Sequence, residues 1–130
     1  MEDGMILIFA EDYDPHADVV LLSLKEKGLN VIRVNPEKLD ERLSAISYQL
    51  DKNGSVTGSF TYHNFTVDLS SIRAIFCRNY YFPFTEDDES KTPDDLLIAK
   101  ELESSFRSMC ESLTCQWINA PWFMDACESK

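Results

Sequence analysis

The sequence is short of glycine and of positive charge. It holds four glycines among 130 residues and no GxGxxG run, so the close backbone approach to a pyrophosphate that dinucleotide-binding folds need is not supported. Lys and Arg number 12 against 23 Asp and Glu, for a formal net charge of −11. Because nucleic acids and anionic membrane surfaces are bound through clustered Lys and Arg, neither is an expected partner.

Long apolar runs and paired cysteines are also missing. No run approaches the roughly 20 apolar residues of a membrane-spanning helix, and no charged-then-apolar leader opens the chain. The four cysteines include no CxxC pair, so neither a zinc site nor a disulfide framework is indicated. With 44% of its residues hydrophobic, the chain fits one domain, residues 1–130, with its own core. We therefore expect a soluble, cytoplasmic protein with reduced thiols and no metal.

The amino-terminal part of the chain predicts a β-α-β unit. Residues 5–10, MILIFA, form a continuous apolar run of strand length, typical of a sheet covered on both faces. Asp14 suits the N-cap and Pro15 the first turn of a helix near 15–27. Residues 30–35, NVIRVN, predict a second strand that is parallel to the first.

The rest of the chain adds an insertion and then returns to the sheet. Strand-like segments joined by short turns predict an antiparallel hairpin insertion, at residues 46–51, 55–63 and 64–69. Residues 70–79 predict a further buried strand, a long amphipathic helix opens at Pro93, and a short strand at 115–119 precedes a helix from Pro121. The predicted fold class is α/β, with a Rossmann-like, mostly parallel sheet, helices on both faces and the inserted hairpin.

Arg78 and Asn79 stand where a parallel strand would end at its carboxyl side. Ligands of open α/β sheets bind at this edge, and a guanidinium fork with a neighbouring amide suits a carboxylate or a phosphate. A structural interpretation competes: Arg78 would pair with the acidic residues 86–89 and hold that loop down. Both interpretations stay open, and both residues are candidates for binding a substrate or a partner.

Three further candidates follow predicted strands, and the loop with Asp14 and His16 lies at the same predicted edge. Asp14 and His16 follow the first strand, and Asn119 follows the last one. Their structural interpretations are a helix cap, a solvated residue and a turn residue. Because no Ser or Cys nucleophile with a recognisable local signature lies beside His16, we predict no catalytic residue, and the acidic run at 86–89 lacks the spacing of a calcium loop.

Several segments together resemble the amino-terminal domain that precedes the ATP-grasp fold in microviridin-type (graspetide) peptide maturases. They are ILIFAEDYDPHADVV, VIRVNPE, SIRAIFCRNYYFP and WINAPW, with Trp117, Asn119, Pro121 and Lys130 as the more specific matches. In the strand that matches FCRNYYFP the family often has a second arginine where Asn79 stands here. The resemblance covers nearly the whole chain.

The resemblance implies a part of a ligase. Family maturases use ATP and Mg²⁺ to activate a side-chain carboxylate as an acyl phosphate, and a hydroxyl or amine of the same precursor peptide then closes a macrolactone or macrolactam. The ATP and metal groups lie in domains that would follow Lys130, so this chain would hold no cofactor and be inactive alone. Its partners would be those ATP-grasp domains and the precursor peptide, and a homodimer is left open.

Two other functions compete with this one. The chain could be a freestanding Rossmann-like module, binding or regulatory, that docks a protein or peptide partner through its aromatic strand end and acidic loop. A small self-sufficient enzyme is the third hypothesis. Against it, the sequence shows neither a nucleophile paired with a general base nor a phosphate-binding loop at recognisable spacing.

Overall fold

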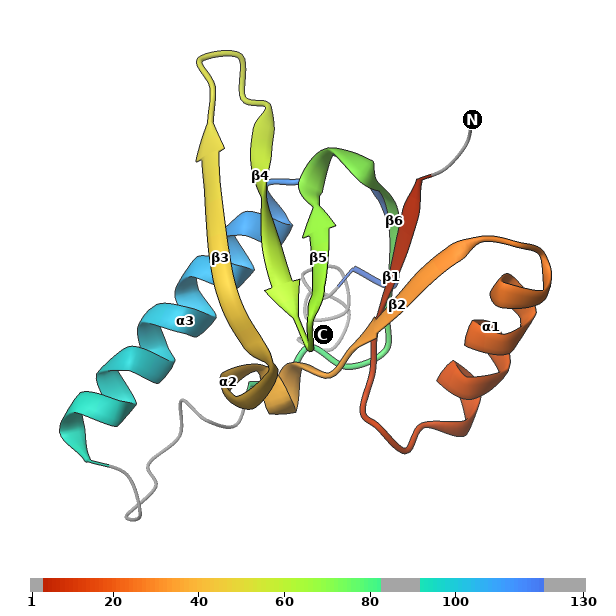
Figure 1. Ribbon diagram of the computed structural model, residues 1–130, viewed down its shortest axis with the longest axis horizontal. Helices are drawn as coiled ribbons and strands as arrows, with labels where there is room; N and C mark the ends of the chain where they lie inside the picture. The colour runs from red at the N-terminus through yellow and green to blue at the C-terminus, as the bar shows by residue number, and fades with distance from the viewer. Residues whose placement is uncertain (1–3, 83–91, 121–130) are drawn as a thin grey trace, which may run out of the picture. The chain divides into compact units, whose positions relative to one another are not determined.

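The computed structural model of the chain describes residues 4–82 and 92–120 (Figure 1). The chain divides into two compact units, each with its own sheet and its own long helix. Unit 1 comprises Met1–Pro36, Ser71–Tyr80 and Cys115–Lys130, and unit 2 comprises Glu37–Ser70 and Tyr81–Thr114.

Unit 1 holds a parallel sheet with the strand order β2-β1-β6-β7. Its strands are β1 (Met5–Phe9), β2 (Asn30–Val34), β6 (Ile72–Cys77) and β7 (Gln116–Ile118). β1 and β6 are the central strands, and Leu7 and Ile8, which point to opposite faces of β1, have no exposed surface, so both faces of β1 are covered there. Ile75 and Cys77 of β6 are buried as expected, whereas Phe76 is only partly buried.

The helix α1 (Pro15–Glu26) connects β1 to β2 and completes the predicted β-α-β unit. Asp14 is the N-cap, and Pro15 takes the first helical position, where its missing N–H breaks no helical bond. Beyond the helix, Gly28 adopts a left-handed φ of +79°, which side chains disfavour. The inner face of α1 shares a core with the sheet, formed by Ile8, Ala10, Ala17, Val20, Leu21, Leu24, Val31 and Phe76.

Unit 2 holds an antiparallel sheet with the order β3-β4-β5, which is the predicted insertion. Its strands are β3 (Leu43–Leu50), β4 (Val56–Tyr62) and β5 (Phe65–Asp68). The turn after β3 is held by Asp51, whose carboxylate accepts the N–H groups of Asn53 at 2.8 Å and Ser55 at 2.9 Å. His63 and Asn64 join β4 to β5 with φ values of 56° and 87°, as a two-residue hairpin turn of type I′ requires.

The long helix α3 (Pro93–Glu111) packs on the sheet of unit 2. A capping box opens it, because the Thr92 hydroxyl accepts the Asp95 N–H at 3.1 Å and the Asp95 carboxylate accepts the Thr92 N–H at 3.4 Å. Further along, the Phe106 ring meets Phe60 of β4 edge to face, with 5.5 Å between the ring centroids. This contact buries both rings and anchors α3 to the sheet.

The predicted α/β fold class is confirmed. The short helical segments η1 (Pro36–Lys38) and α2 (Leu39–Arg42) precede β3, and η2 (Leu69–Ser71) joins β5 to β6. The helix expected from Pro121 lies outside the described residues. None of the helices in the two described ranges is long and apolar enough to cross a bilayer.

Candidate functional site

The carboxyl ends of the parallel strands in unit 1 meet at one edge of the sheet. The register pairs Phe9 at the end of β1 with Val34 of β2 and with Cys77 of β6, and it pairs Phe76 with Ile118 of β7. The residues that follow these strands therefore share the edge where α/β sheets bind ligands. They include four of the five candidates directly, because Asp14, Arg78, Asn79 and Asn119 follow strand ends, and His16 opens the adjoining helix.

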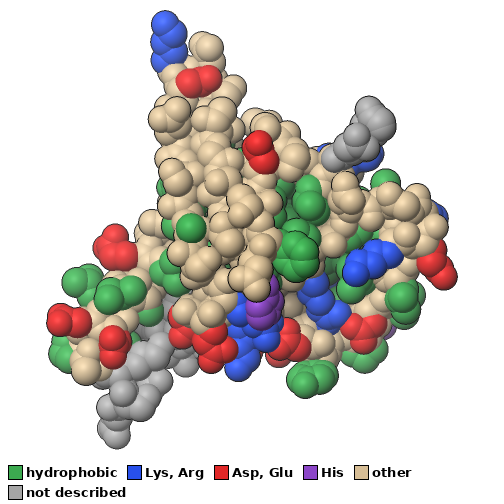
Figure 2. All heavy atoms as spheres, in the orientation of Figure 1, with side chains coloured by type: hydrophobic (Ala, Val, Ile, Leu, Met, Phe, Trp, Pro, Cys, Tyr) green, Lys and Arg blue, Asp and Glu red, His purple; other side chains and the backbone are tan. Residues whose placement is uncertain are grey.

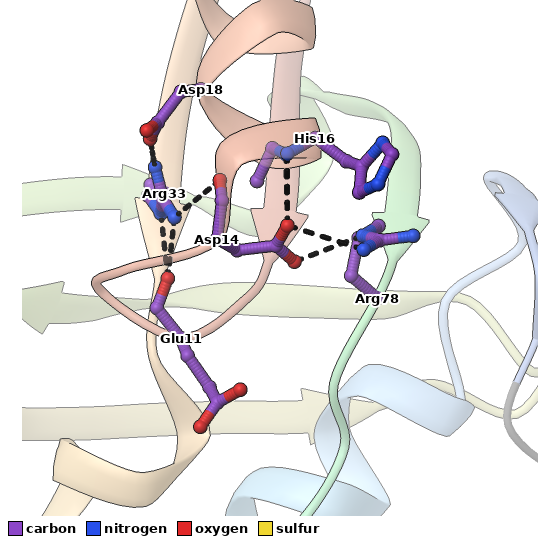
Figure 3. A network of polar contacts seen from close by, with 7 residues as sticks. Glu11, Asp14, His16, Asp18, Arg33 and Arg78 are labelled. Carbon is purple, nitrogen blue, oxygen red and sulfur yellow. Dashed lines mark hydrogen bonds and ion pairs between the residues drawn. The ribbon is translucent and has the colours of Figure 1, made fainter.

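Asp14 accepts four hydrogen bonds at this edge (Figure 3). Its Oδ1 accepts the backbone N–H groups of His16 at 3.0 Å and Ala17 at 3.3 Å, which caps α1. Arg78 supplies the other two bonds, from Nε to Oδ2 at 2.9 Å and from Nη2 to Oδ1 at 3.1 Å. The guanidinium and the carboxylate thus pair through two parallel bonds, the strongest geometry for this ion pair.

The ion pair shifts the pKa values of both partners. The side-chain hydrogen bond from Arg78 lowers the pKa of Asp14 below its ordinary value of 3.8, and the backbone N–H groups of Ala17 and His16 act in the same direction. The hydrogen bond to Asp14 in turn raises the pKa of Arg78. Both groups are therefore charged at neutral pH, and each neutralises the other.

Backbone hydrogen bonds hold Arg78 in place. The Phe9 carbonyl at the end of β1 accepts the N–H of Arg78 at 2.8 Å and the N–H of Asn79 at 3.0 Å. The chain leaving β6 is therefore fastened to the end of β1 before the Arg78 side chain reaches Asp14. This explains how two residues 64 positions apart in the sequence come together.

A second arginine closes the loop between β1 and α1. Arg33 of β2 donates from Nε to the Glu11 carbonyl at 3.1 Å, from Nη2 to the carbonyls of Glu11 and Asp14, and from Nη1 to the Asp18 carboxylate. Only 15% of its side chain is exposed. Figure 3 shows Arg33 and Arg78 on either side of Asp14. Arg33 was not among the predicted site residues, although a lone arginine inside the apolar strand NVIRV was a usable signal.

Aromatic rings lie under the same edge. Phe9 stacks on Tyr80 with 5.9 Å between the centroids, and Trp117 meets both rings edge to face, at 6.0 Å from Phe9 and 6.2 Å from Tyr80. Phe9 is fully buried, whereas Tyr80 and Trp117 are half-buried. Tyr80, the first aromatic residue after β6, therefore packs within unit 1.

The remaining candidates are placed as follows. The exposed His16 contributes its backbone N–H to Asp14, and its ring lies on the Arg78 side of the loop in Figure 3. Asn79 is half-buried. Asn119 is exposed with a left-handed φ of 62°, which Asn tolerates better than most residues and which fits a turn residue. The alternative partners of Arg78, residues 86–89, lie outside the described part of the chain.

This arrangement has a limited chemical capacity. Arg78 has 34% of its side chain exposed, and its Nη1 makes no hydrogen bond within residues 4–82 and 92–120. One face of the guanidinium can therefore receive a carboxylate or a carbonyl from a partner. Both arginines are already bound to protein acceptors, so the edge offers little unpaired positive charge to a triphosphate.

A scan against protein-family models and a search of curated proteins each found no match. Among solved structures, the macrocyclase MdnB from Microcystis aeruginosa MRC superposes with a TM-score of 0.70 and 17% identity, over 88% of this chain and 37% of that chain. The macrocyclase MdnC from the same organism, bound with the precursor peptide MdnA, gives a TM-score of 0.63 and 16% identity, over 88% and 35%.

A third match is a Chryseobacterium gregarium ATP-grasp ligase associated with ribosomally synthesised, modified peptides, in complex with ADP and a leader and core peptide. It gives a TM-score of 0.64 and 19% identity, over 88% of this chain and 34% of that one. The chain thus spans about a third of the length of these three proteins. The fold expected from the family resemblance is confirmed.

Proposed function

We propose that the chain is the accessory, non-catalytic domain of a cytoplasmic ATP-grasp ligase that modifies a ribosomal precursor peptide. The observation that carries the proposal is the fold match, which covers 88% of this chain and about a third of each ligase. The other two thirds would be the ATP-grasp domains, which would follow this domain in the complete enzyme. They would hold ATP and Mg²⁺, and the product would be a macrolactone or a macrolactam.

The chemistry of the sheet edge supports a non-catalytic role. The loop after β1 contains no glycine and carries Glu11 and Asp12, whose negative charge disfavours a phosphate. Arg33 and Arg78 neutralise acceptors of the protein itself. Phosphoryl transfer needs positioned cations around the nucleotide, and this edge uses its cations to hold its own loop.

We assign Arg78 a binding role in the complete ligase. The two hydrogen bonds to Asp14 fix the orientation of the guanidinium, so its exposed part does not turn freely in solvent. A preorganised arginine of this kind suits a carboxylate or carbonyl of the precursor peptide or of a neighbouring domain. Asp14 would act on the partner only through Arg78, as a positioning residue.

The experiment is Arg78→Ala in the complete ligase, with turnover of the precursor peptide and the melting temperature of the domain as two separate readouts. We expect reduced turnover with the fold intact. Arg73→Ala is the matched control, because Arg73 is an exposed arginine of β6, the strand that precedes Arg78, and lies away from the carboxyl end of that strand. Unchanged turnover together with lowered stability would overturn the binding role and leave Arg78 as a purely structural clamp.

A further inference from the structure

The edge strands of the two sheets are protected to different degrees. In unit 1, the edge strand β2 carries the charged Arg33, whose guanidinium donates to the Glu11 carbonyl of the neighbouring loop. The other edge strand, β7, is only three residues long. In unit 2, β5 has four residues and ends at Asp68, which accepts the N–H of Ser70. Short length and charge are the usual devices that keep an edge from pairing with another chain.

β3 has none of these devices along most of its length. Its eight residues, LSAISYQL, include no charged residue and no proline. A register shift between Leu43 and Ala45 marks a bulge at its start, and pairing with β4 is regular from Ala45 to Leu50. On the side away from β4, the described ranges place no strand beside it. Figure 1 shows β3 as the long outer strand of its sheet, and Figure 2 shows a largely uncharged surface along β3 and β4.

A depression lies over the pairing of β3 with β4, one strand in from the free edge. It measures about 260 Å³ and is lined by Ser47, Tyr48, Gln49, Thr57 and Gly58. Gly58 allows the two strands to approach closely here, because a Cβ there would lie 2.1 Å from the Ser47 carbonyl oxygen.

We propose that β3 binds an extended segment of a partner polypeptide as an added antiparallel strand, with an uncharged middle and basic ends. Backbone hydrogen bonds along Ala45–Leu50 would supply the affinity. The net charge of −11 attracts a basic segment and repels a second copy of this chain. The proposal needs only unit 2, so it stands apart from the ligase assignment.

A synthetic peptide, acetyl-Lys-Thr-Val-Thr-Tyr-Thr-Val-Lys-amide, is the probe for the 130-residue chain. We expect saturable binding by fluorescence anisotropy and slower hydrogen exchange of β3 amides, with β5 amides unchanged. Replacing both terminal Lys by Glu is expected to weaken binding about tenfold at low salt. Methylation of alternate backbone nitrogens, which removes the donors of one edge, should abolish binding.

Ser47→Lys and Gln49→Lys test the location, since both side chains are exposed and a charge on an edge opposes strand addition. Each is expected to raise the dissociation constant about tenfold. Ser23→Lys, at an exposed position of α1, adds the same charge elsewhere and should leave binding unchanged. Circular dichroism checks that each variant is folded. One folded β3 variant is enough to test whether the peptide binds at β3.

Three results would overturn the proposal. The first is no binding up to about 1 mM peptide. The second is binding that neither β3 variant weakens, or protection on a different strand. The third is protection of β3 that increases with protein concentration in the absence of peptide, which would assign this edge to a second copy of the chain.

Discussion

Replacing Asp14 by Ala removes the acceptor of four hydrogen bonds at once. The N–H groups of His16 and Ala17 lose their cap, a change that lowers stability by about 0.5–2 kcal/mol in other helices. The loss of the Arg78 ion pair adds less, because solvent screens an exposed pair. We therefore expect Asp14→Ala to lower the free energy of unfolding by about 1–2 kcal/mol, measured by urea denaturation followed by circular dichroism.

Asp14→Asn separates the cap from the charge, since the amide oxygen can still accept the two backbone N–H groups. We expect it to lose less than half as much stability as Asp14→Ala at pH 7. The hydrogen bond from Arg78 lowers the pKa of Asp14 in the folded state, so its stabilisation is complete above the ordinary value of 3.8 and is lost as the pH falls through the lowered value. The difference between wild type and Asp14→Asn should therefore shrink below pH 3.8. A difference that is constant with pH, or an Asp14→Ala variant as stable as wild type, would refute this reasoning.

Two further predictions concern backbone strain and thiol burial. Gly58→Ala is expected to lower the free energy of unfolding by about 3 kcal/mol, because φ is +138° and the new Cβ would lie 2.1 Å from the Ser47 carbonyl oxygen. Gly54→Ala, with φ +86° and open space around it, should lose only about 1 kcal/mol, and equal losses in urea denaturation would contradict the clash. Burial raises the pKa of Cys77 to about 12 and also raises that of Cys115, which is less buried, so iodoacetamide at pH 8 should label Cys115 before Cys77. Equal labelling rates by mass spectrometry would show that Cys77 is accessible.

The elements of the fold were predictable where local signals agreed. The apolar run of β1 suits only a strand buried on both faces, and Asp14 followed by Pro15 is a strong helix start. The position of Arg78 at the carboxyl edge of the sheet was also predictable, because the apolar residues of β6 end at Cys77, directly before it. Apolar residues at helical spacing were a weaker guide to burial in α3, where Leu97 is 59% exposed.

The partners of the charged residues could not be predicted from local patterns. Arg78 pairs with Asp14, 64 positions earlier in the sequence, because β1 and β6 are neighbours in the sheet. Arg33 reaches Glu11 across 22 positions for the same reason, since β2 lies on the other side of β1. Side-chain contacts of this sequence range depend on strand order, which a single sequence specifies only through the whole fold.

The central claim is that this chain supports a ligase without carrying its chemistry. The most direct test is isothermal titration calorimetry of the 130-residue chain with ATP and Mg²⁺, followed by a phosphate-release assay. The account predicts no saturable heat at nucleotide concentrations that saturate a complete ligase, and no phosphate release. Saturable ATP binding by this chain alone, followed by release of phosphate, would contradict it.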